Sequence, residues 1–310
     1  MRYWRTRGRV KKWTGESVKE WNSERVKKDA ERFEDSGSVR FQSRRTFIGA
    51  AAAAIGAVVV RPEAVAHAAT IRPGHEGERL ALASRAASAP GATEVIYSNP
   101  LATAADVADF RLEGDATVSF PEGRMRLAAN RDPSEGQAAN FVFWCPRELP
   151  DRVRISWNFW QLREPGLCIL FFAARGRGGE DLFDPRLSTR TGDYQQYHSG
   201  EIDALHISYF RRRYPDERAF HTCNLRKSHG FHLVAQGADP LPPVEDATPP
   251  YRIELIKDGP RVAFAINELP LLDWTDDGTH GATLAGGKIG FRQMAPLVAE
   301  YSDLLVTSLD

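Results

Sequence analysis

The sequence has little cysteine, and the way its cysteines are spaced excludes some common chemistry. Only three occur in 310 residues, Cys145, Cys168 and Cys223, and no two of them form a CxxC pair. This spacing argues against a zinc knuckle and against a dithiol redox motif. Cys168 lies in the apolar run 167–172 and is expected to be a small core residue. The odd number leaves at least one free thiol, and the sequence allows one disulfide without choosing its partners.

A long hydrophobic run is also absent. The apolar stretch 46–60 is shorter than the ~20 residues that a membrane-spanning helix needs. It overlaps the segment 43–49, Ser-Arg-Arg-Thr-Phe-Ile-Gly, and it precedes Ala-His-Ala at 66–68, where small residues suit a signal peptidase. This order resembles a twin-arginine export signal. We expect export by the twin-arginine machinery, cleavage after Ala68 and a secreted domain without a membrane; the alternatives are an uncleaved anchor and a short buried helix.

The part that follows the signal lacks an excess of positive charge. Lys and Arg total 41 and Asp and Glu total 41, and residues 1–68 hold 15 of the basic and 8 of the acidic residues. The remainder therefore carries 26 basic against 33 acidic residues, a net charge of −7. This balance disfavours nucleic acid as a partner. We assign 1–68 to an extended n-region and signal peptide, 69–92 to a tether, and 93–310 to a single domain.

Sustained helical periodicity is missing from that domain, and short alternating runs take its place. In segment 152–160 the residues Val153, Ile155, Trp157 and Phe159 alternate with polar neighbours and Trp160, which predicts a strand with one buried face. Segment 167–174 is apolar on both faces and is expected to be a central strand. Segments 251–256 and 261–266 flank an Asp-Gly pair, a hairpin signal. Many short strands predict an all-β, two-sheet antiparallel jelly-roll sandwich.

Titratable residues are concentrated in one part of this domain. Five of the eight histidines fall between residues 198 and 232. A cluster of titratable groups is a better candidate for a functional site than any one of its members. The histidines are His198, His206, His221, His229 and His232, and the slightly longer segment 194–232 also holds Tyr194, Tyr197, Tyr209, Glu201, Asp203, Asn224, Arg226 and Lys227.

The segment 200–208, Gly-Glu-Ile-Asp-Ala-Leu-His-Ile-Ser, does not fit simple alternation, which would put two acids and two core residues on one face. One β-bulge at Ala204-Leu205 would remove that conflict. We therefore predict a bulge there. It would place Glu201, Asp203, His206 and Ser208 on one polar, concave face of the sheet.

Glu201-Ile202-Asp203 resembles the signature of laminarinase- and lichenase-type glycoside hydrolases. In those enzymes the first Glu is the nucleophile, the Asp supports it and a final Glu is the acid/base. The present chain has His206 where the final Glu would stand. A retaining hydrolase needs two carboxylates about 5 Å apart, so this departure puts that mechanism in doubt.

A broader resemblance covers nearly all of 93–310. Its runs are 197–206, 220–227, 230–240 and 290–296, which begin Tyr-His-Ser-Gly, Phe-His-Thr-Cys, Gly-Phe-His-Leu and Gly-Phe-Arg-Gln. They resemble the YesU-like family, an uncharacterised group associated with the breakdown of plant polysaccharides. The resemblance implies a jelly-roll fold of the concanavalin A-like lectin/glucanase type. It implies no particular reaction.

Two enzymatic interpretations and one non-catalytic alternative remain. A lyase acting on a uronic-acid-containing polysaccharide would use His206 as base, Tyr197 or Tyr209 as acid, and Arg226, Asn224 or Arg292 to hold the carboxylate. A glycoside hydrolase would use Glu201 or Asp203 with His206. A carbohydrate-binding module would stack sugars on Trp160 and tyrosines. The residues expected to bind the substrate are His198, His221, Asn224, Arg226, His232, Arg292 and Trp160.

No compact ligand spacing predicts a catalytic metal, and no cofactor is expected. A structural Ca²⁺ held by loop carboxylates is the one alternative. The loop Asp276-Asp277-Gly278 is the candidate for it.

Overall fold

The computed structural model describes residues 3–6, 9–12 and 94–309. The chain divides into two compact units, 1–71 and 72–310. The described part of the first unit is an antiparallel hairpin of β1 (Tyr3–Thr6) and β2 (Arg9–Lys12). The predicted signal and tether lie outside the described residues. No helix in the described ranges is long and apolar enough to cross a membrane.

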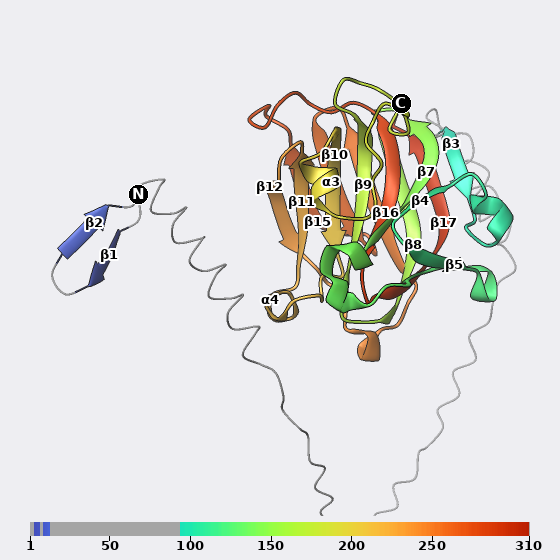
Figure 1. Cartoon of the computed structure of the whole chain (residues 1–310), viewed down its shortest axis with the longest axis horizontal. Helices are drawn as coiled ribbons and strands as arrows, with labels where there is room; N and C mark the ends of the chain where they lie inside the picture. Colours follow the sequence, from blue (N-terminus) through green and yellow to red (C-terminus); the bar gives the residue numbers. More distant parts are fainter. Residues whose placement is uncertain (1–2, 7–8, 13–93, 310) are drawn as a thin grey trace, which may run out of the picture. The chain divides into compact units, whose positions relative to one another are not determined.

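The second unit consists of two antiparallel sheets (Figure 1), as the alternating runs predicted. One sheet has seven strands in the order β12-β11-β10-β9-β16-β7-β4. In chain order these are β4 (Arg111–Glu113), β7 (Phe141–Leu149), β9 (Leu167–Gly176), β10 (Ile202–Tyr209), β11 (Thr222–Ser228), β12 (His232–Ala238) and β16 (Gly287–Met294).

The other sheet has eight strands, with seven in the order β15-β14-β13-β8-β17-β6-β5 and with β3 also paired to β17. In chain order these are β3 (Val95–Asn99), β5 (Ala116–Ser119), β6 (Met125–Ala129), β8 (Val153–Arg163), β13 (Tyr251–Asp258), β14 (Arg261–Ile266), β15 (Leu269–Thr275) and β17 (Val298–Ser308). Helices are short and lie in the connections. They are α3 (Gln195–His198), α4 (Pro215–Ala219) and the 3₁₀ turns η1 (Ala104–Val107), η2 (Pro121–Gly123), η3 (Pro133–Ala139) and η4 (Val244–Asp246).

The main core fills the space between the sheets. The odd-numbered residues Val153–Phe159 of β8 are buried there, as their alternation predicted, and Trp157 packs edge-on against Phe291 of β16. Burying such side chains stabilises the fold by about 1.5–3 kcal/mol each. The three cysteines are buried and free, so the disulfide that the sequence allowed does not form. Cys168 belongs to this core, as expected.

A second apolar cluster covers the outer face of the seven-stranded sheet. Trp144 of β7, Phe171 of β9 and Ile202 of β10 lie beneath Leu182 and Tyr197, which come from the long connection between β9 and β10. Figure 1 shows α3, part of this connection, in front of the sheet. The connection therefore covers part of this outer face, and it forms one wall of the site described below.

The predicted bulge at Ala204-Leu205 is wrong. Strand β10 pairs with β11 in continuous register, from Ala204 opposite Ser228 to Ser208 opposite Asn224. The register shifts instead between β10 and its other neighbour, β9. Asp203 pairs with Arg175 whereas Leu205 pairs with Phe172, so two steps along β10 match three steps along β9. The extra residue is thus on β9, where Ala173 has a φ of 51°.

Strand β10 alternates regularly as a result. Ile202 and Ala204 belong to the outer cluster, whereas Leu205, Ile207 and Tyr209 belong to the main core. His206 and Ser208 continue the outer face.

Candidate functional site

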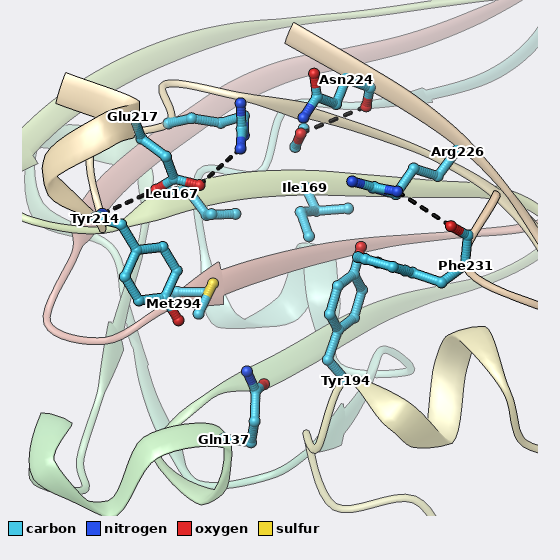
Figure 2. Close-up of a pocket in the computed structure, with 12 residues that line it drawn as sticks. Gln137, Leu167, Ile169, Tyr194, Tyr214, Glu217, Asn224, Arg226, Phe231 and Met294 are labelled. Atoms are coloured by element: carbon cyan, nitrogen blue, oxygen red, sulfur yellow. Dashed lines mark hydrogen bonds and ion pairs between the residues drawn. The ribbon is translucent and has the colours of Figure 1, made fainter. Parts of the chain in front are cut away.

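A pocket of about 230 Å³ opens on the outer face of the seven-stranded sheet (Figure 2). Strands β9, β10, β11 and β16 form its floor, and connections on either side form its walls. Six of its twelve lining residues are aromatic or aliphatic and six are polar or charged, so it offers a ligand both apolar surface and directed polar groups. The lining residues are Gln137, Leu167, Ile169, Tyr194, Ser208, Arg211, Tyr214, Glu217, Asn224, Arg226, Phe231 and Met294.

Arg226 supplies an uncompensated positive charge to this pocket. Its Nη1 donates to the carbonyl oxygen of Phe231 at 3.2 Å, and its guanidinium lies 3.8 Å from the centroid of the Phe231 ring. Within residues 94–309 no carboxylate forms an ion pair with it. Burial, together with the nearby charge of Arg211, lowers its pKa from the ordinary value. A half-buried guanidinium with this environment is suited to bind an anion.

Arg211, by contrast, is neutralised. Its Nη2 donates to Glu217 Oε1 at 2.8 Å, and Glu217 Oε2 accepts the backbone N–H groups of Arg213 and Tyr214, each at 3.0 Å. Glu217 is the only carboxylate in the pocket lining of the described chain, and both of its oxygens are engaged. The pocket therefore does not present the pair of carboxylates that a retaining hydrolase needs.

Tyr194 brings a hydroxyl group into the pocket beside Arg226 (Figure 2). No group in the described ranges forms a hydrogen bond with this hydroxyl. Burial raises the pKa of Tyr194 to about 12, and the charges of Arg292, Arg226 and Arg211 act in the opposite direction. The phenol is thus protonated at neutral pH and lies near three guanidinium groups that would stabilise its anion.

Arg292 lies beneath the pocket and supports Tyr194. Its guanidinium is 4.7 Å from the centroid of the Tyr194 ring, and its Nη2 donates to Gln137 Oε1 at 3.0 Å and to the carbonyl of Gly192 at 3.1 Å. The side chain is fully buried, and its Nε and Nη1 have no hydrogen-bond partner among the described residues. Burial lowers its pKa. A second uncompensated cation therefore adds to the positive potential of the site.

His206 lies on the expected face of β10, but it is buried and not exposed to a substrate. Its ring packs against Phe171 and Tyr194, with centroids 5.1 Å and 5.6 Å apart, and neither ring nitrogen has a hydrogen-bond partner among the residues that the structure describes. Burial holds its pKa well below 6.5, so the imidazole is neutral. The predicted exposed position is wrong because the connection that carries Tyr194 folds over this strand.

Glu201 and Asp203 do not join His206. Glu201 Oε2 accepts the N–H of Ser188 at 2.6 Å and faces a separate open cavity of about 370 Å³. Asp203 lies 3.8 Å from Arg177 at the end of the sheet and, by regular alternation, on the face opposite His206. Their predicted shared face is wrong because it depended on the misplaced bulge.

Neither tyrosine proposed as an acid reaches the pocket. Tyr209 is in the core between the sheets, where its ring meets Phe159 edge-on at 5.3 Å. Tyr197 is buried against Trp144, and its hydroxyl accepts the N–H of Gly192 at 3.1 Å. Burial raises the pKa of both phenols.

The predicted binding residues divide between the pocket and distant positions. Asn224 lines the pocket and contacts Gln236 at 2.7 Å, and His198 lies beside it, 4.7 Å from Phe231 between ring centroids. His221 instead bonds the carbonyl of Arg218, and His232 stacks on His280 at 4.0 Å.

Trp160 is on the other sheet, where β8 pairs it with Glu300 and where Arg124 covers its ring at 5.0 Å. It lies away from the histidine-rich segment because the two belong to different sheets.

One of the two carboxylates of the candidate calcium loop is already neutralised. Lys227 Nζ donates to Asp276 Oδ2 at 2.6 Å in a buried pair, and it also donates to the carbonyl of Gly281. Asp277 Oδ1 accepts the N–H of Thr279. Nowhere in the described ranges do three His, Cys, Asp or Glu side chains come together as a metal site. The alternative of a structural Ca²⁺ at this loop therefore has no support in these contacts.

Sequence reasoning missed several pocket residues. Tyr194 stood within the histidine-rich stretch, but nothing in its local pattern indicates that its connection folds over the sheet. The rim residues Arg211, Tyr214, Glu217 and Phe231 come from turns, where alternation gives no signal. The cluster of aromatic and basic residues at 209–214, Tyr-Phe-Arg-Arg-Arg-Tyr, is the one local feature that could have indicated them.

The fold and pocket together define a jelly-roll β-sandwich protein with a cationic, aromatic pocket on the outer face of one sheet. Residues 94–306 match the family described as "Domain of unknown function (DUF1961)", and the chain belongs to this family. It is 57% identical over 212 residues to "Uncharacterized protein YesU" of Bacillus subtilis (strain 168), a match that covers 68% of this chain and 94% of the relative.

A solved structure agrees with this assignment. The chain resembles a Bacillus subtilis protein of unknown function with a galectin-like fold, with a TM-score of 0.67 and 55% identity over 69% of this chain and 96% of that one. The predictions of a YesU-like protein and of a jelly-roll sandwich are confirmed.

Proposed function

We propose that this protein is an exported, carbohydrate-active lyase that binds a uronic-acid unit of an acidic polysaccharide in the Arg226 pocket. The observation that carries the proposal is the half-buried Arg226 guanidinium, which has no acidic partner among the described residues and faces a small cavity. The galectin-like fold of the structural relative supports a role with carbohydrates.

The pocket matches a uronate in both charge and shape. Arg226 offers a planar fork that fits a carboxylate, and the neighbouring Asn224 and Ser208 offer polar groups to sugar hydroxyls. The apolar floor of Leu167 and Ile169 and the ring of Tyr194 suit the apolar face of a sugar. A neutral sugar would leave the half-buried Arg226 guanidinium without a counter-charge, which favours an acidic ligand.

β-Elimination is the cleavage chemistry that these groups support. Tyr194, as its phenolate, removes the proton at C5 of the uronate, and that electron pair forms the C4–C5 double bond. The bond between C4 and the glycosidic oxygen breaks, and Tyr194 returns the proton to that oxygen. Arg226 stabilises the charge that develops on the carboxylate during proton removal.

The predicted hydrolase chemistry has less support. Glu201 and Asp203 face away from the pocket, and Glu217 is engaged by Arg211 and two backbone N–H groups. A non-catalytic binding module remains the second candidate, because Tyr194 is protonated at neutral pH. Export through the twin-arginine pathway completes the proposal; it rests on Arg44, Arg45 and the residues that follow them.

Incubation with pectic and other acidic glycans tests the proposed function. A lyase raises both the reducing-end concentration and the absorbance near 235 nm, because the product contains a conjugated double bond. A hydrolase raises the reducing-end signal alone, and this result would contradict the elimination. Saturable binding without either signal would favour the binding module.

A further inference from the structure

The pocket is too small to enclose more than one sugar unit. Its volume of about 230 Å³ is below the ~300–1,000 Å³ of sites that enclose drug-sized ligands. A polysaccharide whose acidic unit occupies this cavity must therefore continue over the surface on one or both sides.

Two exposed aromatic rings flank the cavity. Tyr214 is 46% exposed and Phe231 is 49% exposed, although both line the pocket. Figure 2 shows them on opposite sides, with the pocket floor between them. Leu233 of β12, 47% exposed, pairs with Arg226 across the strands and is a further exposed apolar side chain next to it.

The backbone of Tyr214 and the ring of Phe231 are held in place by groups of the pocket itself. Tyr214 precedes α4, and its backbone N–H donates to Glu217 Oε2 at 3.0 Å. The carbonyl of Phe231 accepts from Arg226, whose guanidinium packs on the ring. A surface that is rigid before binding loses little conformational entropy when the ligand arrives. Exposed apolar area next to a cationic cavity marks an interaction site.

We infer that Tyr214 and Phe231 form two stacking subsites, one on each side of the Arg226 cavity, for the sugar units that flank the bound uronate. The ligand is therefore an internal stretch of at least three units of an acidic polysaccharide. The inference rests on the proposed function and extends it, because it specifies the minimum length of the polysaccharide ligand and which of its sugar units occupies the Arg226 cavity.

Isothermal titration calorimetry with oligouronates of one to five units tests this inference, with galacturonate, mannuronate and glucuronate series as probes. The variants are Tyr214→Ala, Phe231→Ala and their combination. Phe220→Ala is the matched control, because Phe220 is 75% exposed but does not line the pocket.

We expect the affinity of the unmodified protein to rise with length up to three units and then to level off. Each pocket-rim variant should lower the ratio of trimer affinity to monomer affinity by about tenfold, a loss of ~1.4 kcal/mol. The Phe220 variant should match the unmodified protein. Equal affinity for monomer and trimer, or a length dependence that survives both substitutions, would overturn the inference.

Neutral oligosaccharides of the same lengths separate this inference from the proposed function. If they bind with a length dependence that needs both rings while no uronate binds, the flanking subsites stand and the uronate proposal falls. If no saccharide binds, as would be the case for a surface that docks a protein, both are overturned.

Discussion

At the scale of single residues, the pocket is surrounded by polar and charged groups that lack ion-pair or hydrogen-bond partners among the described residues. Arg226 has no acidic partner within 94–309, Arg292 is buried with two unbonded nitrogens, and the Tyr194 hydroxyl has no hydrogen bond in that range. Among these three groups the fully buried Arg292 costs stability, since buried polar groups without partners are unfavourable. Their gathering around one cavity is the physical reason to place the function there.

Substitution of Tyr194 by Phe should abolish elimination without abolishing binding. We expect the elimination rate to fall by about 10²–10⁴-fold, the usual contribution of a proton-transfer group, and the Kd for an oligouronate to change little. Tyr97→Phe, which removes a hydroxyl outside the pocket, is the matched control. Initial rates at 235 nm and calorimetry give the two readouts, and unchanged elimination in the Tyr194 variant would rule out its role as base.

The rate should also depend on pH in a direction that the Tyr194 pKa fixes. Since that pKa is raised to about 12, the phenolate fraction rises tenfold per pH unit throughout the range in which the protein can be assayed. Elimination should therefore accelerate from pH 7 to pH 10. A rate that is independent of pH, or one that falls over this range, would show that another group removes the proton.

His206 should make folding stability sensitive to acid. Its pKa lies well below 6.5 in the folded protein, where the ring is buried near Arg226, Arg292 and His198, so the unfolded chain binds its proton more readily. The free energy of unfolding therefore keeps its full value above pH 6.5. It decreases as the pH falls below 6.5, by up to ~2 kcal/mol at pH 5.

Urea unfolding at pH 7.5 and pH 5.0 of the unmodified protein and His206→Phe measures this effect. The variant should lose less stability on acidification. His198, whose pKa burial also lowers, is present in both proteins and cancels in the comparison. An equal loss in the two proteins would mean that His206 accepts a proton in the folded state.

At the scale of elements, the connection between β9 and β10 decides where the site lies. Glu113 of β4 accepts from Trp144 Nε1 at 2.8 Å and from Arg190 Nη2 at 2.7 Å, so one carboxylate ties this connection to the sheet. The same connection carries Tyr194 over His206. The wall of the pocket is therefore held by a partly buried ion pair some distance from the cavity.

Arg190→Met should loosen that wall. The ion pair with Glu113 is largely buried, and removing one partner of such a pair costs about 3 kcal/mol. Arg186→Met in the same connection is the control, because its pair with Asp184 is exposed and its loss should leave the unfolding midpoint unchanged. Hydrogen exchange should accelerate at 182–199 in the Arg190 variant, and uniform protection there would contradict the anchoring role.

The strands themselves could be predicted from the sequence, whereas the site could be predicted only in part. The alternation along β8 and the Asp-Gly turn between β13 and β14 are local signals, and all three of these predicted strands form. Which residues of β10 share a face was predicted wrongly because the extra residue lies in the neighbouring strand β9, and the sequence of β10 itself gives no sign of it. His206 is buried by the connection between β9 and β10, and Trp160 lies away from the site because its strand belongs to the other sheet. Both features depend on tertiary contacts that local sequence patterns do not show.

At the scale of the whole molecule, the jelly roll within 94–309 contains its own core and site. Removal of residues 1–68 should therefore leave the midpoint of urea unfolding unchanged in a chain that begins at Ala69. A clearly lower midpoint than that of the full chain would show that the N-terminal part stabilises the sandwich.

Replacement of both Arg44 and Arg45 by Lys should block export and leave the precursor in the cytoplasm. Fractionation of the producing cells, with Arg61→Lys as the control outside the arginine pair, measures this outcome. Normal secretion of the double variant would contradict the assignment of a twin-arginine signal.

The claim that Arg226 recognises a carboxylate is tested most directly by comparing an oligouronate with its carboxyl-reduced, neutral counterpart. Calorimetry should show that the unmodified protein prefers the acidic form by at least about tenfold, because a charge-assisted hydrogen bond contributes about 1.5–3 kcal/mol. Arg226→Gln should abolish that preference, and Arg261→Gln, on the other sheet, should preserve it. Equal affinity of the unmodified protein for the two forms, or a preference that survives Arg226→Gln, would contradict the account.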